Sequence, residues 1–320
     1  GLFGHDPWKT DDAVGFGIVH DMLTSGRWLV PHLAGEPFVE DGPLFYWLAA
    51  ASASLFSWLL PSHDAARLAS LVGIVAALYF TRLAARELYG RAQGDLSVLA
   101  LMGCLGLMVH ARDATAETIA LGAIAAAYYG VAIAWRKPLK AGVCFGLGAG
   151  CAFLAKGLIA LTPLAVAAIV LLPIALVWHE RSYLRAMMIG VPILLPFLAV
   201  WPIIINTAVG IRNIPQDYRN VAQVLRLNHY EFFTKIMIPS AAPYIFTGLR
   251  IGIGLSWLAI VAAEMLTGGV GIGFFIWDAW NSSRLPDIIV ALAYIGGIGF
   301  VLDRVVAVVA HFVTRGTASN

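Results

Sequence analysis

Charged residues are scarce in this chain. Asp, Glu, Lys and Arg make up 12% of its 320 residues, whereas hydrophobic residues make up 60%. An average soluble domain is about a quarter charged and about half apolar. The composition therefore excludes an ordinary soluble domain and predicts an all-α, polytopic integral membrane protein. The net charge of +2 adds little, because the placement of Lys and Arg carries the information in a membrane protein.

Cysteine is also rare, and Cys104, Cys144 and Cys151 all lie within apolar runs. Such residues ordinarily act as small buried hydrophobic side chains, and their spacing indicates neither a disulfide framework nor a metal site. The glycines from Gly268 to Gly273 are not followed by Lys-Ser or Lys-Thr, so they do not form a nucleotide-binding loop. We therefore expect this chain to bind no cofactor of its own.

The first 42 residues are polar, aromatic and charged, and are too polar to cross a bilayer. They predict a structured extracytoplasmic loop with a short helix over Asp12–Thr24. The chain begins at Gly1 with neither a methionine nor a hydrophobic leader, which indicates a fragment that lacks its first membrane helix.

Nine apolar runs follow this loop. A membrane span needs about 20 apolar residues, and several runs are marginal, so we expect eight or nine transmembrane helices, with the first run either crossing or lying in the interface. Two sets of glycines spaced four apart, Gly142, Gly146 and Gly150 and then Gly248 and Gly252, predict close helix packing. The runs are Pro43–Leu60, Ala66–Leu83, Leu96–Val109, Ile119–Trp135, Leu139–Leu154, Leu158–Trp178, Met187–Asn206, Tyr244–Leu266 and Ile288–Phe312.

Basic residues gather in three clusters that should face the cytoplasm. Between the clusters, Asp113 and Lys156 fall on the outer side. This arrangement is self-consistent up to Arg185 if Pro43–Leu60 does not fully cross the membrane. The clusters are Arg82, Arg86 and Arg91; Arg136, Lys137 and Lys140; and Arg181 and Arg185.

One long polar stretch, Asn206–Pro243, interrupts the apolar second half and predicts two short amphipathic helices joined by a turn. Pro215 suits the first turn of a helix, where its missing N–H costs nothing. Asn228 can cap the second helix with Glu231 as its capping-box partner. We expect Pro239 to end that helix. The alternative is a generic amphipathic pair of helices at the membrane interface.

The same stretch resembles the cytoplasmic coupling loop of importer-type ABC permeases, whose pattern is Glu-Ala-Ala, a Gly four positions on, and an Ile-x-Leu-Pro ending. The family's Glu and Gly are both absent here. The longer run GLRIGIGLSWLAIVAAEMLTGGVGIGFFIWDAWNSS is similar to nitrate, sulfonate and bicarbonate permeases, especially nitrate permeases, and the resemblance covers Trp201 to Val313. The positions that match the coupling pattern are Asn220-Val221-Ala222, Arg226 and Ile236-Met237-Ile238-Pro239.

This resemblance implies the permease subunit of an ABC importer for a small oxyanion, with nitrate favoured, in the bacterial inner membrane. ATP would be bound by separate ATPase subunits. Other implied partners are a second permease copy, an external substrate-binding protein and membrane lipid, with no nucleic acid. The residues that would couple to the ATPase are Asn220, Val221, Ala222, Arg226, Ile236 and Pro239.

Two charges lie within or at the ends of the Tyr244–Leu266 run. Glu264, near the outer end, is a candidate for the transport path or gate, although it could simply mark the membrane boundary. Arg250 is expected near the inner end, where its long side chain would reach the interface.

Residues up to about Val200 resemble a different family, the GT-C membrane glycosyltransferases related to protein mannosyltransferases and aminoarabinose transferases. The shared features are an acidic pair before a helix, the runs SGRWLVPHLAGEPF and PLFYWLAA, an Arg-Asp pair at the outer start of a helix, and a later Lys-Gly. The pairs are Asp11-Asp12, Arg112-Asp113 and Lys156-Gly157.

This second resemblance implies a polyprenyl-phosphate sugar donor and a first-loop acid that activates the acceptor or holds a divalent metal. Asp11, beside Asp12, would be that base or ligand, Asp113 would support it, and Lys156 would contact the phosphate. The residue types suit the chemistry, because a cation stabilises the charge on a departing phosphate and a carboxylate orients or deprotonates the nucleophile.

One departure concerns donor binding. The family commonly has Lys-Pro-Pro-Leu where this chain has Asp41-Gly42-Pro43-Leu44, so an acid replaces a lysine expected near the lipid phosphate. Ordinary structural roles also remain open: helix capping for Asp11 and Asp12, an interfacial helix start for Asp113, and snorkelling for Lys156.

The two resemblances divide the chain into residues 1–200 and 201–320 and impose opposite orientations on the Met187–Asn206 span. If Arg181 and Arg185 face the cytoplasm, this span delivers the coupling loop to the outside, although the loop is itself rich in Arg and Lys. Both parts also look incomplete. We therefore rank the permease first, a glycosyltransferase, which would be an enzyme, second, and third a hybrid without intact activity, either a gene fusion or an assembly artefact.

Overall fold

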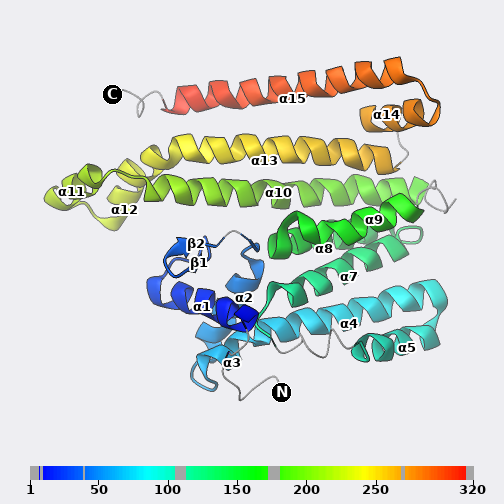
Figure 1. Cartoon of the computed structure of the whole chain (residues 1–320), viewed down its shortest axis with the longest axis horizontal. Helices are drawn as coiled ribbons and strands as arrows, with labels where there is room; N and C mark the ends of the chain where they lie inside the picture. Colours follow the sequence, from blue (N-terminus) through cyan, green and yellow to red (C-terminus); the bar gives the residue numbers. More distant parts are fainter. Residues whose placement is uncertain are drawn as a thin grey trace. The chain divides into compact units, whose positions relative to one another are not determined.

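The computed structural model describes residues 7, 10–38, 40–104, 113–171, 181–267 and 271–314 (Figure 1). The chain divides into two compact units, which are described separately below. The first unit is Gly1–Phe197 with Leu266–Gly269, and the second is Leu198–Met265 with Val270–Asn320.

The first unit begins with helix α1 (Thr10–Ser25), which confirms the short helix expected in the polar loop. A two-stranded antiparallel hairpin follows, made of β1 (His32–Leu33) and β2 (Glu36–Pro37). Its two turn residues, Ala34 and Gly35, both have positive φ (53° and 88°), as a tight two-residue hairpin loop requires. Two short helices come next, α2 (Leu44–Phe56) and α3 (Ser62–Ala66).

Longer helices build the rest of the first unit. Pro138 occupies the first turn of one of them, where a missing N–H costs nothing. Gly90 and Gly157, with φ of 101° and 63°, mark the ends of two others. The elements are α4 (Leu68–Tyr89), α5 (Arg91–Met102), α7 (Ala116–Ile133), α8 (Pro138–Lys156), the 3₁₀ turn η1 (Gly157–Leu161) and α9 (Thr162–Leu171).

Helix α10 (Arg181–Arg212) starts in the first unit and continues into the second. Arg181 and Arg212 therefore lie at opposite ends of one helix of 32 residues, about 48 Å long at 1.5 Å per residue. If this helix crosses the membrane, its two basic ends lie on opposite sides.

The second unit holds the coupling stretch and two long helices. Its elements are α11 (Gln216–Val224), α12 (His229–Phe232), the π-helical turn η3 (Phe233–Met237), α13 (Ile238–Thr267), α14 (Ile272–Asn281) and α15 (Leu285–Thr314).

The expected helix end at Pro239 is wrong. Helix α13 begins at Ile238, directly after η3, and runs through Pro239 to Thr267. A proline ring ordinarily clashes with the carbonyl four residues earlier. The wider π turn immediately before Pro239 changes that spacing, and Pro239 falls in the first turn of α13, where its missing N–H is tolerated.

Six helical segments among the described residues are long and apolar enough to cross a membrane, so the chain is a polytopic membrane protein. Helix α2, with 13 residues, is about 20 Å long and falls short of the roughly 30 Å hydrocarbon core. Eight or nine spans were expected, but the predicted runs Leu96–Val109 and Leu158–Trp178 extend outside the described residues. The six segments are Ser62–Tyr89, Ala116–Ile133, Pro138–Ala167, Arg181–Arg212, Tyr230–Met265 and Leu285–Thr314.

The glycine strips pack helices closely, as predicted. In the first unit, a Cβ added to Gly142 would lie 2.5 Å from the carbonyl oxygen of Ala186, and one added to Gly146 would lie 2.5 Å from that of Gly190. The two contacts advance together along the chain, so α8 and α10 are parallel there and begin at the same end. In the second unit, Gly248 meets the α10 backbone in the same way.

This packing brings the three basic clusters to one end of the first unit, as the sequence predicts. Arg136 at the end of α7 pairs with Glu87 near the end of α4, with Nη1 2.8 Å from Oε1. Lys140 at the start of α8 and Arg185 at the start of α10 lie at the same end because those helices are parallel.

Candidate functional site

A buried ion cluster fixes the acidic pair of the first unit. Asp12 is 1% exposed and Arg67 is fully buried. The Nη2 of Arg67 donates to Oδ2 of Asp12 at 2.7 Å, and its Nη1 donates to Oδ1 of Asp64 at 2.9 Å. The other oxygen of Asp12 accepts the backbone N–H of Ala114 at 2.8 Å. Asp12 therefore ties α1 to α3, α4 and the segment before α7.

The other predicted acids take different positions. Asp11 is exposed in the first turn of α1. Asp113 is buried, and its carbonyl oxygen accepts the hydroxyl of Ser70 at 2.8 Å. Helix α1 packs closely against the segment that carries Asp113 and Ala114, since a Cβ on Gly15 of α1 would lie only 2.0 Å from the carbonyl oxygen of Ala114. The structure thus brings Asp12 beside Asp113–Ala114 and leaves Asp11 accessible.

Lys156 lies between two carboxylates. Its Nζ is 3.0 Å from Oδ1 of Asp41 and 2.6 Å from Oε1 of Glu117. Burial raises the pKa of the Asp41 carboxyl, and the hydrogen bond from Lys156 opposes that rise. Asp41 is the residue that replaces the lysine of the glycosyltransferase pattern, so here a lysine from α8 supplies positive charge at the replaced position.

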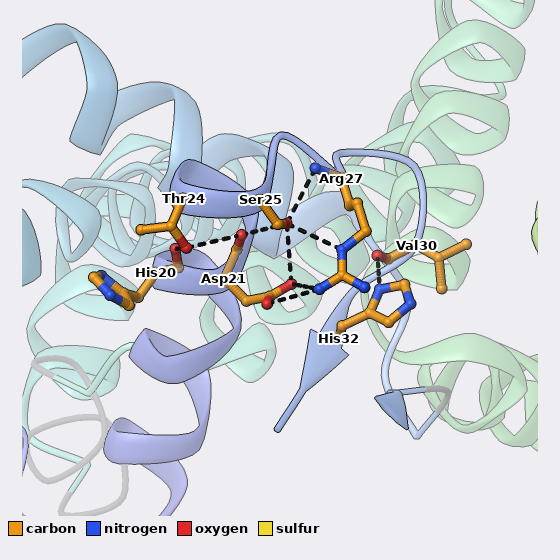
Figure 2. Close-up of polar contacts among 7 residues, drawn as sticks. All are labelled: His20, Asp21, Thr24, Ser25, Arg27, Val30 and His32. Atoms are coloured by element: carbon orange, nitrogen blue, oxygen red, sulfur yellow. Dashed lines mark hydrogen bonds and ion pairs between the residues drawn. The ribbon is translucent and has the colours of Figure 1, made fainter. Parts of the chain in front are cut away.

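A surface cluster closes the turn after α1 (Figure 2). The guanidinium of Arg27 points at Asp21, with Nη2 3.0 Å from Oδ1, and its Nε donates to the Ser25 hydroxyl at 3.1 Å. The nearby ring of His32 places Nδ1 2.8 Å from the carbonyl oxygen of Val30, so Nδ1 carries the proton. All these bonds join residues that are close together in the sequence, and they stabilise the SGRW turn.

A divalent metal finds no prepared ligand set within the described part of the chain, where no three His, Cys, Asp or Glu side chains gather in a suitable group. Asp12 and Asp64 are each paired with the Arg67 guanidinium, which takes the place that a metal cation would occupy between them. The residues present therefore do not fit a metal at the acidic pair.

In the second unit, α11 ends in a left-handed cap at the position where the permease pattern has glycine. Arg226 has φ of 49°. Its N–H donates to the carbonyl of Gln223 at 3.1 Å, and the N–H of Leu227 donates to that of Ala222 at 3.1 Å. This pair of bonds is a Schellman motif, in which glycine is the preferred residue. Arg226 therefore adopts the backbone geometry of the Schellman motif without being a glycine.

Helix α11 exposes most of its large apolar side chains. Ala222 is buried and anchors the helix, whereas Asn220 is exposed and accepts a bond from Gln216 at 3.3 Å. Isolated exposed apolar residues are ordinary, but here a group of them gathers on a nine-residue helix and its C-cap. The group is Tyr218 (53% exposed), Val221 (50%), Val224 (82%) and Leu225 (63%).

The second helix of the polar stretch, α12, begins as predicted. The backbone N–H of Asn228 donates to Oε2 of Glu231 at 3.2 Å, which is one half of the expected capping box. Ile236 lies in η3, and Pro239 lies in the first turn of α13; both are half-buried.

Glu264 caps helix α14. Its Oε2 accepts the backbone N–H of Gly273 at 3.0 Å. A Cβ on Gly271 or on Gly273 would lie within 3 Å of the Glu264 side chain, so both glycines make room for the carboxylate. A carboxylate at a helix N-terminus is stabilised by the helix dipole, and this position ties the end of α13 to α14.

Arg250 does not reach toward a helix end, contrary to the sequence expectation. It lies 20 residues into the apolar segment Tyr230–Met265 and pairs with Asp303 of α15. Both contacts of this bidentate pair, Nε to Oδ1 and Nη2 to Oδ2, are 2.6 Å long.

Sequence reasoning missed four of these residues: Arg67, Asp64, Glu117 and Asp303. The sequence did contain a local indication that Arg67 forms an ion pair, since Arg67 lies at the start of an apolar run and has Asp64 three residues before it. Asp303 also had one, because an acid inside a 30-residue apolar helix needs a partner. The partners themselves lie 55 and 53 residues away, so no local pattern identifies them.

Comparison with known families yields two matches. The family described as "Binding-protein-dependent transport system inner membrane component" matches residues 154–315. The family described as "Dolichyl-phosphate-mannose-protein mannosyltransferase" matches residues 40–205. Each match covers about half of the chain, and the two overlap over 154–205.

Curated relatives are transport permeases. The chain is 67% identical over 109 residues to a nitrate import permease protein of Synechocystis sp., covering 34% of this chain and 40% of the relative. It is 47% identical over 192 residues to the nitrate import permease protein of Leptolyngbya laminosa, covering 58% and 66%. A bicarbonate transport system permease protein of Synechococcus elongatus is 51% identical over 151 residues, covering 47% and 52%. The chain thus spans 40% to 66% of these relatives' lengths.

Among solved structures, the fold is similar to that of ArnT from Cupriavidus metallidurans bound to undecaprenyl phosphate. The TM-score is 0.54 at 19% identity, over 91% of this chain and 55% of that one. This likeness concerns the fold alone. Both resemblances seen in the sequence are confirmed, and the chain is a multi-pass inner-membrane protein that belongs to the binding-protein-dependent transport inner membrane component family and, over its first part, to the dolichyl-phosphate-mannose-protein mannosyltransferase family.

Proposed function

We propose that the chain acts as a permease subunit of an ABC importer for a small oxyanion, with nitrate the first candidate. ATP would be hydrolysed by separate ATPase subunits, and an external binding protein would deliver the anion. The family match and the nitrate and bicarbonate permease relatives support this proposal.

The observation that carries the proposal is the apolar surface of α11. Tyr218, Val221, Val224 and Leu225 are held exposed on a helix that the Arg226 cap ends sharply. Such a surface suits a groove on a partner ATPase. Asn220 would lie at the edge of that contact, while Ala222, Ile236 and Pro239 would transmit its movement into α13. Glu264, at the far end of α13, would couple the same helix to α14 and so act at the gate.

We also propose that a second copy of the permease subunit packs against this chain, because the second unit buries little of its own apolar surface. Only 17% of the most apolar part of Tyr230–Met265 and 6% of that of Leu285–Thr314 are buried. Lipid can cover some of this surface, and a second permease subunit would cover the rest.

The test is stimulation of the ATPase of a nitrate importer by the reconstituted chain. Leu225 and Leu285 are both 63% exposed leucines of the second unit, one beside α11 and one at the start of α15, so they form a matched pair. We expect Leu225→Asp to abolish stimulation and Leu285→Asp to preserve it. Equal activity in the two variants would contradict docking through α11.

A glycosyltransferase is the second candidate, and the position of Asp11 favours it. The Asp12–Arg67–Asp64 cluster fixes α1 and leaves the Asp11 carboxylate accessible. Asp11 would act as the base, Asp113 would support the helix that carries it, and Lys156 would meet the phosphate of a polyprenyl-phosphate sugar donor. Because Lys156 already contacts Asp41 and Glu117, the donor would have to compete with two carboxylates.

Transfer of sugar from such a donor tests this candidate. Asp11→Asn should abolish transfer, whereas Asp21→Asn, on the same helix, should leave it. Absence of transfer by the unaltered chain would exclude the enzyme. Absence of both transfer and ATPase stimulation would identify a hybrid without intact activity.

A further inference from the structure

We propose that Arg250 is an oxyanion-binding residue and that Asp303 is its resident counterion, which a transported anion displaces. This inference deepens the proposed import function and rests on it. Arg250 is neither one of the predicted coupling positions nor part of the contact between Glu264 and α14, so the inference adds a new residue to the proposed function.

The pair lies far from the helix ends. At 1.5 Å per residue, Arg250 is about 18 Å along α13 from Ile238, and Asp303 is about 16 Å along α15 from Thr314. Charged side chains at such depth are costly to insert and mark ion or substrate pathways in membrane proteins. Each charge needs an opposite charge whenever no other ion is present, and the two residues satisfy that need for each other.

The geometry of the pair is that of an occupied oxyanion site. The Nε and Nη2 groups of Arg250 meet the two oxygens of one carboxylate, both at 2.6 Å. This edge of a guanidinium binds planar oxyanions through two parallel hydrogen bonds. Nitrate and bicarbonate are planar and present two oxygens in the same way as a carboxylate, so either anion can replace the Asp303 carboxylate on Arg250.

The surroundings favour an exchange. The side chains of Arg250 and Asp303 remain 45% and 38% exposed in this unit, so its own helices leave the pair partly uncovered. The charge of Arg304 also acts on Asp303, and its guanidinium lies 4.8 Å over the Phe300 ring. Two cations and one carboxylate gather here, which leaves a net positive charge for a monovalent anion.

A separate contact keeps the helices in register during such an exchange. Trp257 of α13 donates its indole N–H to the carbonyl of Ile295 in α15 at 3.3 Å. The pairs Arg250–Asp303 and Trp257–Ile295 run in opposite directions along the two helices, so α13 and α15 are antiparallel. Displacement of Asp303 therefore need not separate them. The returning carboxylate would then promote release, which transport requires as much as binding.

The test uses the purified chain in lipid nanodiscs, without an ATPase, and isotope-edited infrared spectra of ¹⁵N-nitrate. Contact of two nitrate oxygens with one guanidinium lowers the anion's symmetry and splits its stretching band. We expect Asp303→Asn to tighten nitrate binding by roughly tenfold or more, because a charge-assisted competitor is removed. Arg250→Gln and Arg250→Lys should lose the split band, the latter while keeping the charge.

Asp287→Asn, which changes another acid of α15, is the control and should leave the band unchanged. If Asp303→Asn weakens binding as Arg250→Gln does, or if Arg250→Lys retains the split band, the proposal is overturned and the pair only holds the helices together. ATPase stimulation is measured separately. A missing band together with intact stimulation therefore rejects the anion site and retains the importer, whereas a band without stimulation does the reverse.

Discussion

The two units differ in where they keep their apolar surface and their charges. In the first unit, 56% of the most apolar part of Ala116–Ile133, 50% of that of Pro138–Ala167 and 22% of that of Ser62–Tyr89 are buried, against 17% and 6% for the two long segments of the second unit. The first unit also encloses the Arg67 cluster, whereas the Arg250–Asp303 pair of the second unit stays partly exposed. Two of the three segments that lie wholly in the first unit are thus largely covered by its own helices, while the long segments of the second unit leave most of their apolar surface uncovered.

This difference bears on function. A unit that encloses a buried ion cluster is built to hold a fixed geometry. Exposed helix faces, an exposed α11 and a partly exposed ion pair are what the proposed contacts with other subunits would require. The following predictions test that contrast, in order of decreasing effect.

The largest effect is expected at the buried cluster. Arg67→Met would leave two buried carboxylates without their guanidinium, which ordinarily costs about 3–5 kcal/mol of unfolding free energy. Arg27→Met, which breaks the exposed pair with Asp21 in Figure 2, should cost less than about 1 kcal/mol. Thermal unfolding in detergent, followed by tryptophan fluorescence, compares the two variants.

A rescue variant sharpens that comparison. Adding Asp12→Asn and Asp64→Asn to Arg67→Met removes the uncompensated charges and should recover much of the lost stability. Equal losses for Arg67→Met and Arg27→Met would contradict a self-contained first unit.

An intermediate effect is expected from one substitution made in each unit. Gly146→Ala places a methyl group 2.5 Å from the carbonyl oxygen of Gly190, and such overpacking should cost about 1–3 kcal/mol. Gly296→Ala in α15 meets nothing within 4 Å and should be neutral or stabilising by up to about 1 kcal/mol. Unfolding midpoints of the two variants provide the measurement, and a shared sign would contradict the difference in packing between Gly146 and Gly296.

The smallest effect is expected at the end of α11. Arg226→Gly relieves a left-handed backbone, which should stabilise the cap by up to about 1 kcal/mol. Arg219→Gly, the same change inside α11, should destabilise the helix by a similar amount. Hydrogen exchange of the α11 amides should slow in the first variant and quicken in the second. Faster exchange in both would refute the strained cap.

Local features of the fold could be predicted from the sequence, while long-range pairs could not. The α1 helix, the Glu231 half of the capping box and the spacing of the glycine strips depend on residues a few positions apart. The prediction that Pro239 ends a helix was wrong, because the effect of this proline on the helix depends on the π turn that precedes it. The partners of Asp12, Lys156 and Arg250 lie on other elements, and only the folded chain brings them together.

The candidate site follows the same division. The predicted coupling positions rest on a sequence pattern, yet the reason that Arg226 can stand in place of glycine appears only in its φ angle. Likewise, the replaced lysine at Asp41 was visible in the sequence, but its compensation by Lys156 was not.

The orientation of α10 connects the two functional readings. Its basic ends, Arg181 and Arg212, lie at opposite ends of one helix. If it crosses the membrane, only one of them faces the cytoplasm. A permease requires the Arg212 end, which leads into α11, to be the cytoplasmic one.

The most direct measurement is side-specific labelling of a single cysteine placed at Asn228, in a variant lacking Cys104, Cys144 and Cys151. The side chain of Asn228 is exposed in the turn between α11 and α12, so folding does not hide it. The permease account predicts labelling by an impermeant maleimide from the cytoplasmic side only. Labelling from the outside only would place α11 beyond the reach of any ATPase and contradict the account.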